Sequence, residues 1–463
     1  MFDTNIYTNR RRILKDKFDS GLILFLGNEN TPANYLANTY NFRQDSTFLY
    51  YFGIDRPGFA ATIDIDNNLE TLFGNDFTID DIVWEGMQPS VSDYAEIVGV
   101  KRATTLEKLN DQIIGAIKKG RKVHFLPQYR LENILKLSKI SGLNSSNVND
   151  YTSEKLIKAV VAQRSIKSDE EIAEIDEAVD IAVKMHTAAM KMVKPDTDER
   201  KIAGMIEGIA LSFGYGLSFR PIVSINGQTL HNPYYENKMK AGDLLVNDSG
   251  AESKLHYASD ITRTIPVGGK FSDKQREIYQ IVLKAEMNAI NSVKPGVTNK
   301  ELHFGAAKDI ASGLIELGLM FGNAQEAVNA GAHTLFFPHG LGHMLGLDVH
   351  DMEGLGEDYV GYDESVQRSD EFGLKYLRLA KSLQPGYVFT IEPGIYFIPE
   401  LIDTWKTQNR FPEFINYDML ENYTGFGGIR IEDDILVTED GHRVLGSKQI
   451  PKSVEEIEAI VSK

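Results

Sequence analysis

The chain of 463 residues contains no cysteine. That absence excludes disulfide bonds, thiolate catalysis and cysteine-ligated zinc, and it is compatible with the cytoplasmic location that we expect. Long apolar runs are also missing: no stretch of 18 apolar residues occurs, so we expect no membrane span. Residues 1–18 have no apolar core long enough for a signal peptide.

Basic residues are outnumbered, with 49 Lys plus Arg against 66 Asp plus Glu and a formal net charge of −17. This balance argues against nucleic acid and against an anionic membrane surface as partners, because both attract basic proteins. The hydrophobic share of 42% and the charged share of 25% are typical of a soluble globular protein. The length favours two domains over one.

The first part of the chain alternates strand and helix patterns. Three segments predict strands and one predicts a helix, in the order Gly21–Gly27, Ala60–Ile65, Thr105–Lys119 (the helix) and Lys122–Leu126. We therefore expect an N-terminal α/β domain over residues 1–165. Ser168, followed three residues later by Glu171, predicts a capped helix start, and we place the second domain at 166–463.

The second domain shows an internal repeat. One helix pattern runs into Val193–Thr197, and a second runs into Val293–Thr298, each followed by another helix pattern. Each half later has a glycine-led apolar strand with a carboxylate six residues after the glycine, in Gly242–Asp248 and in Gly386–Glu392. Two related halves that face each other would bring both carboxylates near one pseudo-twofold axis.

Four carboxylates and one histidine form the candidate metal site. Asp248 ends an apolar strand, where a bare carboxylate is costly unless it is paired or metal-bound. Asp260 lies twelve residues on, and an intervening hairpin would bring it back to Asp248. Glu392 and Glu432 also interrupt or follow apolar runs. Converging carboxylates repel one another unless cations lie between them. A solvated acidic surface is the alternative for any one of them alone.

The histidines divide into two groups. His339 and His343 are spaced as in a helical zinc motif, but the interleaved glycines oppose a helix, so we expect His343 to be a single ligand on a loop or strand. His350 is expected beside the substrate. An oxygen-rich site with one imidazole suits Mn²⁺, with Co²⁺ or Zn²⁺ as alternatives. Six others are expected to be structural or exposed: His124, His186, His256, His303, His333 and His442.

Five segments in order, NDSGAE, SDITRTIPV, HGLGHMLGLDVHD, TIEPGIY and GIRIED, resemble the "pita-bread" metallopeptidases. Over nearly the whole chain the resemblance is to the Xaa-Pro branch, prolidase and aminopeptidase P. Phe42–Ser46 and Trp84–Gly86 are similar to the N-terminal domain of that branch, which methionine aminopeptidases lack. The resemblance implies an α+β chain with a pita-bread catalytic domain, an aminopeptidase P-like N-terminal domain and a homodimer.

The resemblance also implies roles. Asp248 would chelate one divalent ion, His343 and Glu392 would hold a second, and Asp260 and Glu432 would bridge them. A hydroxide between the metals would attack the carbonyl of an Xaa-Pro bond, with Glu392 moving the proton. The residues that the resemblance places around the substrate are His231, His339, His350 and Arg430. All of them except His339 are also assigned to catalysis.

Substrate length stays open between proline-containing dipeptides and longer peptides. Arg378 precedes Glu392 by fourteen residues, the spacing at which prolidases carry an arginine that binds the substrate carboxylate. The alternative is a solvent-facing arginine in a basic patch with Lys375 and Lys381. One departure is Phe219, which stands where family members often have a tyrosine.

Three other functions are alternatives: an inactive binding protein on the same fold, a metal-independent creatinase-like hydrolase, and a phosphoester hydrolase. The intact set of five ligands disfavours the first two.

Overall fold

The computed structural model describes residues 1–462, which form two compact units. The first unit is Met1–Gln163, and the second begins at Arg164, inside helix α7 (Glu154–Ser165). No helix within the described residues is both long and apolar enough to cross a membrane.

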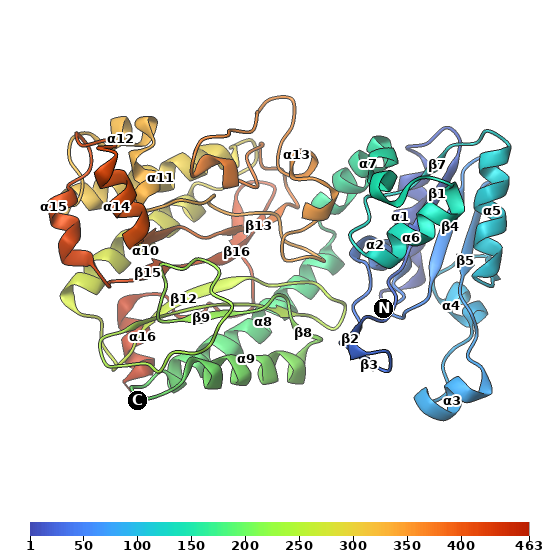
Figure 1. The fold of residues 1–463 in the computed structure, drawn as a ribbon, viewed down its shortest axis with the longest axis horizontal. Coiled ribbons are helices and arrows are strands. Elements are labelled where there is room, and N and C mark those ends of the chain that lie inside the picture. The colour runs from blue at the N-terminus through green and yellow to red at the C-terminus, as the bar shows by residue number, and fades with distance from the viewer. Residues whose placement is uncertain (463) are drawn as a thin grey trace. The chain divides into compact units, whose positions relative to one another are not determined.

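The first unit is built on a five-stranded sheet of order β6-β5-β4-β1-β7 (Figure 1). β1 pairs antiparallel with β4 and parallel with β7, so the sheet is mixed. Its core lies between side chains such as Leu24 and Phe73 on the sheet and Ile113 and Leu137 on the helices. The strands are β1 (Leu22–Leu26), β4 (Ala60–Asp64), β5 (Leu69–Phe73), β6 (Arg102–Thr104) and β7 (Val123–His124).

Six further helices belong to this unit, and Asp45, Thr78 and Ser90 cap the starts of α2, α3 and α4 with side-chain oxygens. They are α1 (Thr4–Lys15), α2 (Ser46–Phe52), α3 (Ile79–Glu85), α4 (Val91–Ile97), α5 (Glu107–Lys118) and α6 (Leu131–Ser141).

Helix α3 and the hairpin β2 (Pro32–Tyr35) to β3 (Asn38–Thr39) differ from the rest of this unit because they bury almost nothing. We call their exposed apolar side chains the α3 apolar surface. Trp84 is 86% exposed and Leu36 84%. The other members are Tyr35, Tyr40, Ile79, Val83 and Met87.

The second unit contains two helix pairs, and each pair is followed by a three-stranded antiparallel sheet. α8 packs against β10, β11 and β12, while α10 packs against β13, β14 and β15. The first half comprises α8 (Asp169–Met192), α9 (Glu199–Phe213) and the sheet β9 (Ile222–Ser224), β10 (Leu244–Ser249) and β12 (Ile261–Pro266). The second comprises α10 (Asp273–Asn291), α11 (Asn299–Glu316) and the sheet β13 (Val388–Ile391), β16 (Asp433–Val437) and β17 (His442–Val444).

Shorter elements complete this unit, and the capping box predicted at Ser168 and Glu171 is confirmed at the start of α8. The remaining strands are β8 (Gly216–Leu217), β11 (Ala251–Glu252), β14 (Gly394–Tyr396) and β15 (Gly428–Arg430). The remaining helices are α12 (Ala324–Ala330), α13 (Glu357–Val360), α14 (Pro399–Thr407), α15 (Tyr417–Leu420) and α16 (Val454–Val461).

The two turns between the paired helices repeat each other closely, and even their backbone hydrogen bonds are equivalent. Asp196 and Gly296 occupy the same place in the two turns, and both have left-handed backbones, with φ of 67° and 86°. Their N–H groups donate to the carbonyls of Met239 (2.9 Å) and Leu383 (2.9 Å). A non-glycine residue in this conformation is uncommon, so Asp196 tolerates what Gly296 adopts freely.

The two sheets meet where Glu432 donates its backbone N–H to the carbonyl of Thr262 at 3.1 Å. Glu432 lies between β15 and β16 of the second half, and Thr262 lies on β12 of the first. This junction brings the carboxylate-bearing strand ends of both halves to one place.

Buried histidines in the second unit should make its stability depend on pH. Both ring nitrogens of His303 lack a hydrogen-bond partner in the described part of the chain, and burial, aided by the nearby His333, lowers its pKa to about 3. The unfolded chain takes up a proton near pH 6.5 and the folded protein does not, so stability should fall as pH drops from 6.5 towards 3. In His303→Phe this loss should shrink by about 1.4 kcal/mol per pH unit. Urea unfolding at several pH values measures it, and parallel curves for variant and wild type would refute the assignment.

Candidate active site

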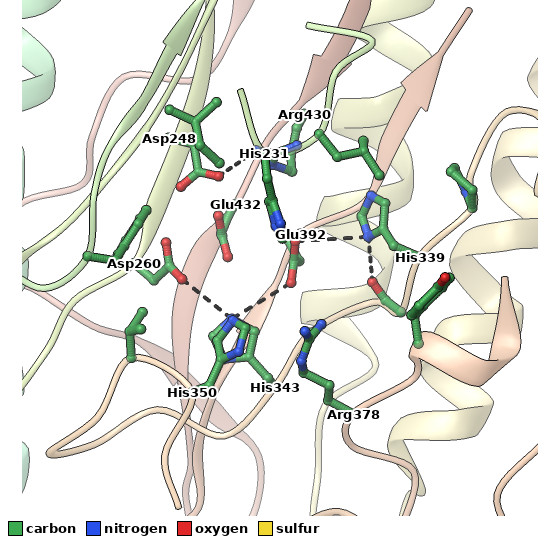
Figure 2. Close-up of a pocket in the computed structure, with 18 of the residues that line it drawn as sticks. His231, Asp248, Asp260, His339, His343, His350, Arg378, Glu392, Arg430 and Glu432 are labelled. Carbon is green, nitrogen blue, oxygen red and sulfur yellow. Dashed lines mark hydrogen bonds and ion pairs between the residues drawn. The ribbon is translucent and has the colours of Figure 1, made fainter. Parts of the chain in front are cut away.

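A cavity of about 820 Å³ in the second unit gathers every site residue predicted from the sequence (Figure 2). Phe219 also lines it, at the position where a tyrosine hydroxyl is missing. The ten predicted residues on its wall are His231, Asp248, Asp260, His339, His343, His350, Arg378, Glu392, Arg430 and Glu432.

The two aspartates come from the hairpin predicted between them. β10 and β12 pair antiparallel with Asp248 opposite Thr262, and Asp260 directly precedes β12. Both carboxylates are buried, and Oδ1 of each has no hydrogen-bond partner among residues 1–462. A buried carboxylate oxygen without a partner is costly, and a cation is the ligand that would satisfy both oxygens.

His343 lies in a segment that runs beside β13, not in a helix. Its N–H donates to Thr390 Oγ1 at 3.2 Å, and its carbonyl accepts from the Thr390 N–H at 3.0 Å. A Cβ at Gly342 would lie 1.8 Å from the Thr390 carbonyl oxygen, which explains the glycine before the histidine. The prediction of a non-helical His343 is confirmed.

Asp260, His343 and Glu432 each offer a ligand atom, and these atoms lie within 4.8 Å of one another. His343 Nε2 is 3.4 Å from Asp260 Oδ2 and 3.8 Å from Glu392 Oε1. Figure 2 shows these side chains converging with Asp248 around one space. The donor set, three or four carboxylates with one imidazole, therefore fits a divalent cation centre.

Burial and mutual repulsion raise the pKa of three of these carboxyl groups. Burial is the main cause that raises the pKa of Asp260 well above its ordinary value, and the negative charge of Glu432 is the second. The pKa of Glu432 is also raised well above its ordinary value, first by burial and second by the charge of Glu392. The pKa of Glu392 rises to about 8, with burial as the main cause, although Arg430 opposes the shift. The charge repulsion that the sequence predicted is thus present in the fold.

Arg430 is buried in the wall and holds three groups. Its guanidinium contacts the Asp248 carboxylate and donates to Tyr396 Oη at 3.0 Å and Thr262 Oγ1 at 3.2 Å. The Thr262 hydroxyl in turn donates to Glu432 Oε2 at 2.7 Å. Arg430 therefore orients two of the carboxylates, directly or through Thr262.

Tyr396 is a site residue that the sequence did not single out. Its hydroxyl lies 2.9 Å from His339 Nε2, while His339 Nδ1 lies 2.8 Å from the Gly340 carbonyl oxygen. Both nitrogens of His339 are thus engaged in the wall. The only available signal was that Tyr396 ends the TIEPGIY segment, two residues after the glycine that begins β14.

His350 and Arg378 lie on one side of the cavity. The His350 ring is 4.0 Å from that of His343 between centroids, and its Nδ1 contacts Glu353. Arg378 is half-buried and lines the cavity, whereas Lys381 is buried and Lys375 exposed, so the three do not form one solvent-facing patch. His231 is the most exposed predicted residue of the wall.

Comparison with known proteins agrees with this geometry. Residues 173–439 match the model of metallopeptidase family M24, and residues 7–124 match the aminopeptidase P N-terminal domain. The chain is 33% identical over 434 residues to a probable Xaa-Pro aminopeptidase of Aspergillus terreus, covering 91% of this chain and 89% of that protein. It is 31% identical over 455 residues to the human Xaa-Pro dipeptidase, covering 95% and 88%.

Solved structures agree over the full length. A variant of Escherichia coli aminopeptidase P superposes with a TM-score of 0.81 at 30% identity, covering 100% of this chain and 98% of that one. Aminopeptidase PepP of Pseudomonas aeruginosa gives 0.82 at 26% identity with the same coverage. The cavity lined by carboxylates and the two domain matches agree. This α+β chain with a pita-bread catalytic domain belongs to metallopeptidase family M24 and is a metallopeptidase of the aminopeptidase P and prolidase branch.

Proposed function

We propose that this enzyme hydrolyses the peptide bond between an N-terminal residue and proline. The observation that carries the proposal is one cavity lined by a complete set of candidate metal ligands and by three further histidines. Relatives named for Xaa-Pro cleavage, both aminopeptidases and a dipeptidase, support the substrate class but do not separate the two.

Two divalent ions, Mn²⁺ first, would be held by the five ligands Asp248, Asp260, His343, Glu392 and Glu432. The orphaned Oδ1 atoms of both aspartates support this assignment. When bound, such ions polarise a carbonyl oxygen and make water a nucleophile at neutral pH.

Glu392 is the carboxylate that we assign to proton transfer. Its side chain is 20% exposed, against 10% for Asp248 and 8% for Asp260, so it is the more accessible to a bound peptide. It also lies between two imidazoles, 3.8 Å from His343 and 4.0 Å from His339. A proton taken up at Glu392 can therefore be passed on to the departing proline nitrogen.

His350 and His231 are assigned to the substrate's carbonyl oxygen. Because the Glu353 carboxylate accepts from His350 Nδ1, the opposite nitrogen, Nε2, faces the substrate and donates to its carbonyl oxygen when the ring is an imidazolium. His339 is assigned to the pocket wall, where its ring offers a surface for the substrate. Arg430 keeps Asp248 in place and so acts on the reaction through that carboxylate.

An Xaa-Pro bond needs a dedicated enzyme for a simple reason. Proline has no amide N–H and its φ angle is fixed, so peptidases that grip that N–H cannot hold the bond. A pocket that polarises the carbonyl and protonates the ring nitrogen avoids that requirement.

The proposal is tested with Mn²⁺-loaded enzyme on Ala-Pro, Ala-Pro-Ala and Ala-Ala side by side. We expect release of alanine from at least one proline peptide and little from Ala-Ala. Chelation should abolish the activity, and Mn²⁺, Co²⁺ or Zn²⁺ should restore it, because the ligands are held ready in the fold. No hydrolysis with any of the three ions would overturn the proposal. Activity that survives complete metal removal would instead favour a creatinase-like reaction.

We also propose a homo-oligomer. The family resemblance supports it, and exposed apolar side chains such as Trp84 on α3 and Leu36 in the β2–β3 turn are available for contacts between copies. Light scattering on the purified chain measures the mass directly.

A further inference from the structure

One carboxylate oxygen joins two groups of the substrate pocket. Glu353 Oε2 contacts His350 Nδ1 and also accepts from Arg378 Nε at 3.3 Å. Glu353 follows His350 by three residues, and its N–H donates to the His350 carbonyl at 3.2 Å. Met352, with a left-handed φ of 63°, makes the turn tight enough for this arrangement. Glu353 itself does not line the cavity.

A second carboxylate faces the same edge of Arg378. Glu357, on α13, lies 3.6 Å from Arg378 Nε and is shared with Arg368. Two carboxylates thus lie beside the guanidinium on its Nε side. Within residues 1–462 the two Nη atoms make no hydrogen bond, and the guanidinium points into the cavity (Figure 2).

Arg378 can therefore present its Nη edge to a substrate while its charge is already compensated. A bidentate arginine binds a terminal carboxylate most strongly when no other anion competes for it. Glu353 and Glu357 reduce that advantage, because the field of a partnered guanidinium is weaker than that of a free one.

Resting on the proposed Xaa-Pro activity, we propose that Glu353 sets the substrate length. By compensating Arg378, it lowers the preference for a free carboxylate next to proline, so the pocket accepts Xaa-Pro peptides that continue beyond proline as well as dipeptides. Glu353 acts through Arg378 and does not line the cavity, so it is a positioning residue.

A purely structural role for Glu353 predicts something different. If it only held His350, its removal would slow all substrates by the same factor. The ratio of kcat/KM for Ala-Pro to kcat/KM for Ala-Pro-NH₂ separates the two roles, because these substrates differ only in the terminal charge.

The experiment measures this ratio in wild type and in Glu353→Gln, both loaded with Mn²⁺. Glutamine keeps an acceptor for His350 and removes the charge. We expect the ratio to rise about threefold, mainly through a lower KM for Ala-Pro, as suits a half-exposed ion pair. Glu357→Gln should change it in the same direction by less. Asp358→Asn, an exposed carboxylate that pairs with Arg368 instead, is the matched control and should leave the ratio unchanged.

A double-mutant cycle closes the test. In an Arg378→Gln background, Glu353→Gln should no longer alter the ratio. An unchanged ratio in the single variant, or the same change in both backgrounds, would overturn the inference. If wild type cleaves neither peptide, the proposed function fails, and calorimetric dissociation constants of Ala-Pro and Ala-Pro-NH₂ supply the ratio instead. Absence of binding by both peptides would overturn both proposals.

Discussion

Replacing Asp260 with asparagine should eliminate peptidase activity and weaken Mn²⁺ binding by at least about tenfold, the scale on which even outer-shell partners of a metal act. Asp260 Oδ1 is a buried oxygen with no protein partner, and Oδ2 lies 3.4 Å from His343 Nε2. An amide of the same shape supplies a neutral oxygen and an N–H₂ group that repels a cation.

The fold should survive this change, and its stability gives a second readout. Without metal, the variant should melt at a temperature equal to or above that of wild type, because one member of a repelling carboxylate group has been removed. With Mn²⁺ the order should reverse, since only wild type gains full binding energy. Activity, metal titration and thermal melts with and without chelator measure these effects. Asp403→Asn, on the exposed surface of α14, is the control. Wild-type turnover in Asp260→Asn would refute the ligand assignment.

Replacing Asp351 with asparagine should destabilise the second unit by about 3–5 kcal/mol, the cost of breaking a buried ion pair. Asp351 Oδ1 lies 2.6 Å from Arg164 Nη2 and Oδ2 lies 2.8 Å from Lys167 Nζ. The side chains of all three are at most 3% exposed. Removing the Asp351 charge leaves Lys167 without its carboxylate partner and leaves Arg164 with only the more exposed Asp348.

The direction of the Asp351 pKa supports this reading. Burial alone would raise the pKa, but Lys167 and Arg164 outweigh it and the pKa is lowered. The stabilisation is therefore fully present above the ordinary carboxyl pKa and is lost as pH falls below it, through the lowered pKa of the folded protein. Asp348→Asn is a matched control, because Asp348 also contacts Arg164 but its side chain is 41% exposed. Denaturant unfolding should show a much smaller effect there, and equal losses in both variants would contradict the prediction. The double change Lys167→Met with Asp351→Leu should recover part of the loss.

The sequence predicts that the five candidate metal ligands come together, and all five line one cavity, because each lies at a place where a local pattern breaks. Asp248 lies near the end of an apolar strand, and Gly342 permits the close approach of the His343 segment to Thr390. The equivalent turns at Asp196 and Gly296 are also formed by neighbouring residues, so the sequence alone predicts the internal repeat.

Contacts between distant segments are not readable in this way. Arg430 and Asp248 are 182 residues apart, and although the family resemblance places both at one site, no local pattern in either segment predicts their ion pair. The Asp351 cluster joins the end of α7 to the loop after His350 through pairs 184 and 187 residues apart. Such pairs depend on tertiary packing, which a single sequence does not encode position by position. Arg378 is an intermediate case. Its spacing from Glu392 predicted that it lines the pocket, but nothing in the sequence predicted its contacts with Glu353 and Glu357.

The repeated helix-pair and sheet has a consequence for how the protein holds together. Asp248 and Asp260 belong to the first copy, whereas His343, Glu392 and Glu432 belong to the second. An ion held by both copies would act as a removable cross-link across the duplication, contributing about 2.7 kcal/mol at a hundredfold excess over its dissociation constant. Loss of the metal would then weaken the interface between the two copies. The rate at which other proteases cleave this chain would therefore rise when metal is scarce, whether or not the enzyme is hydrolysing substrate.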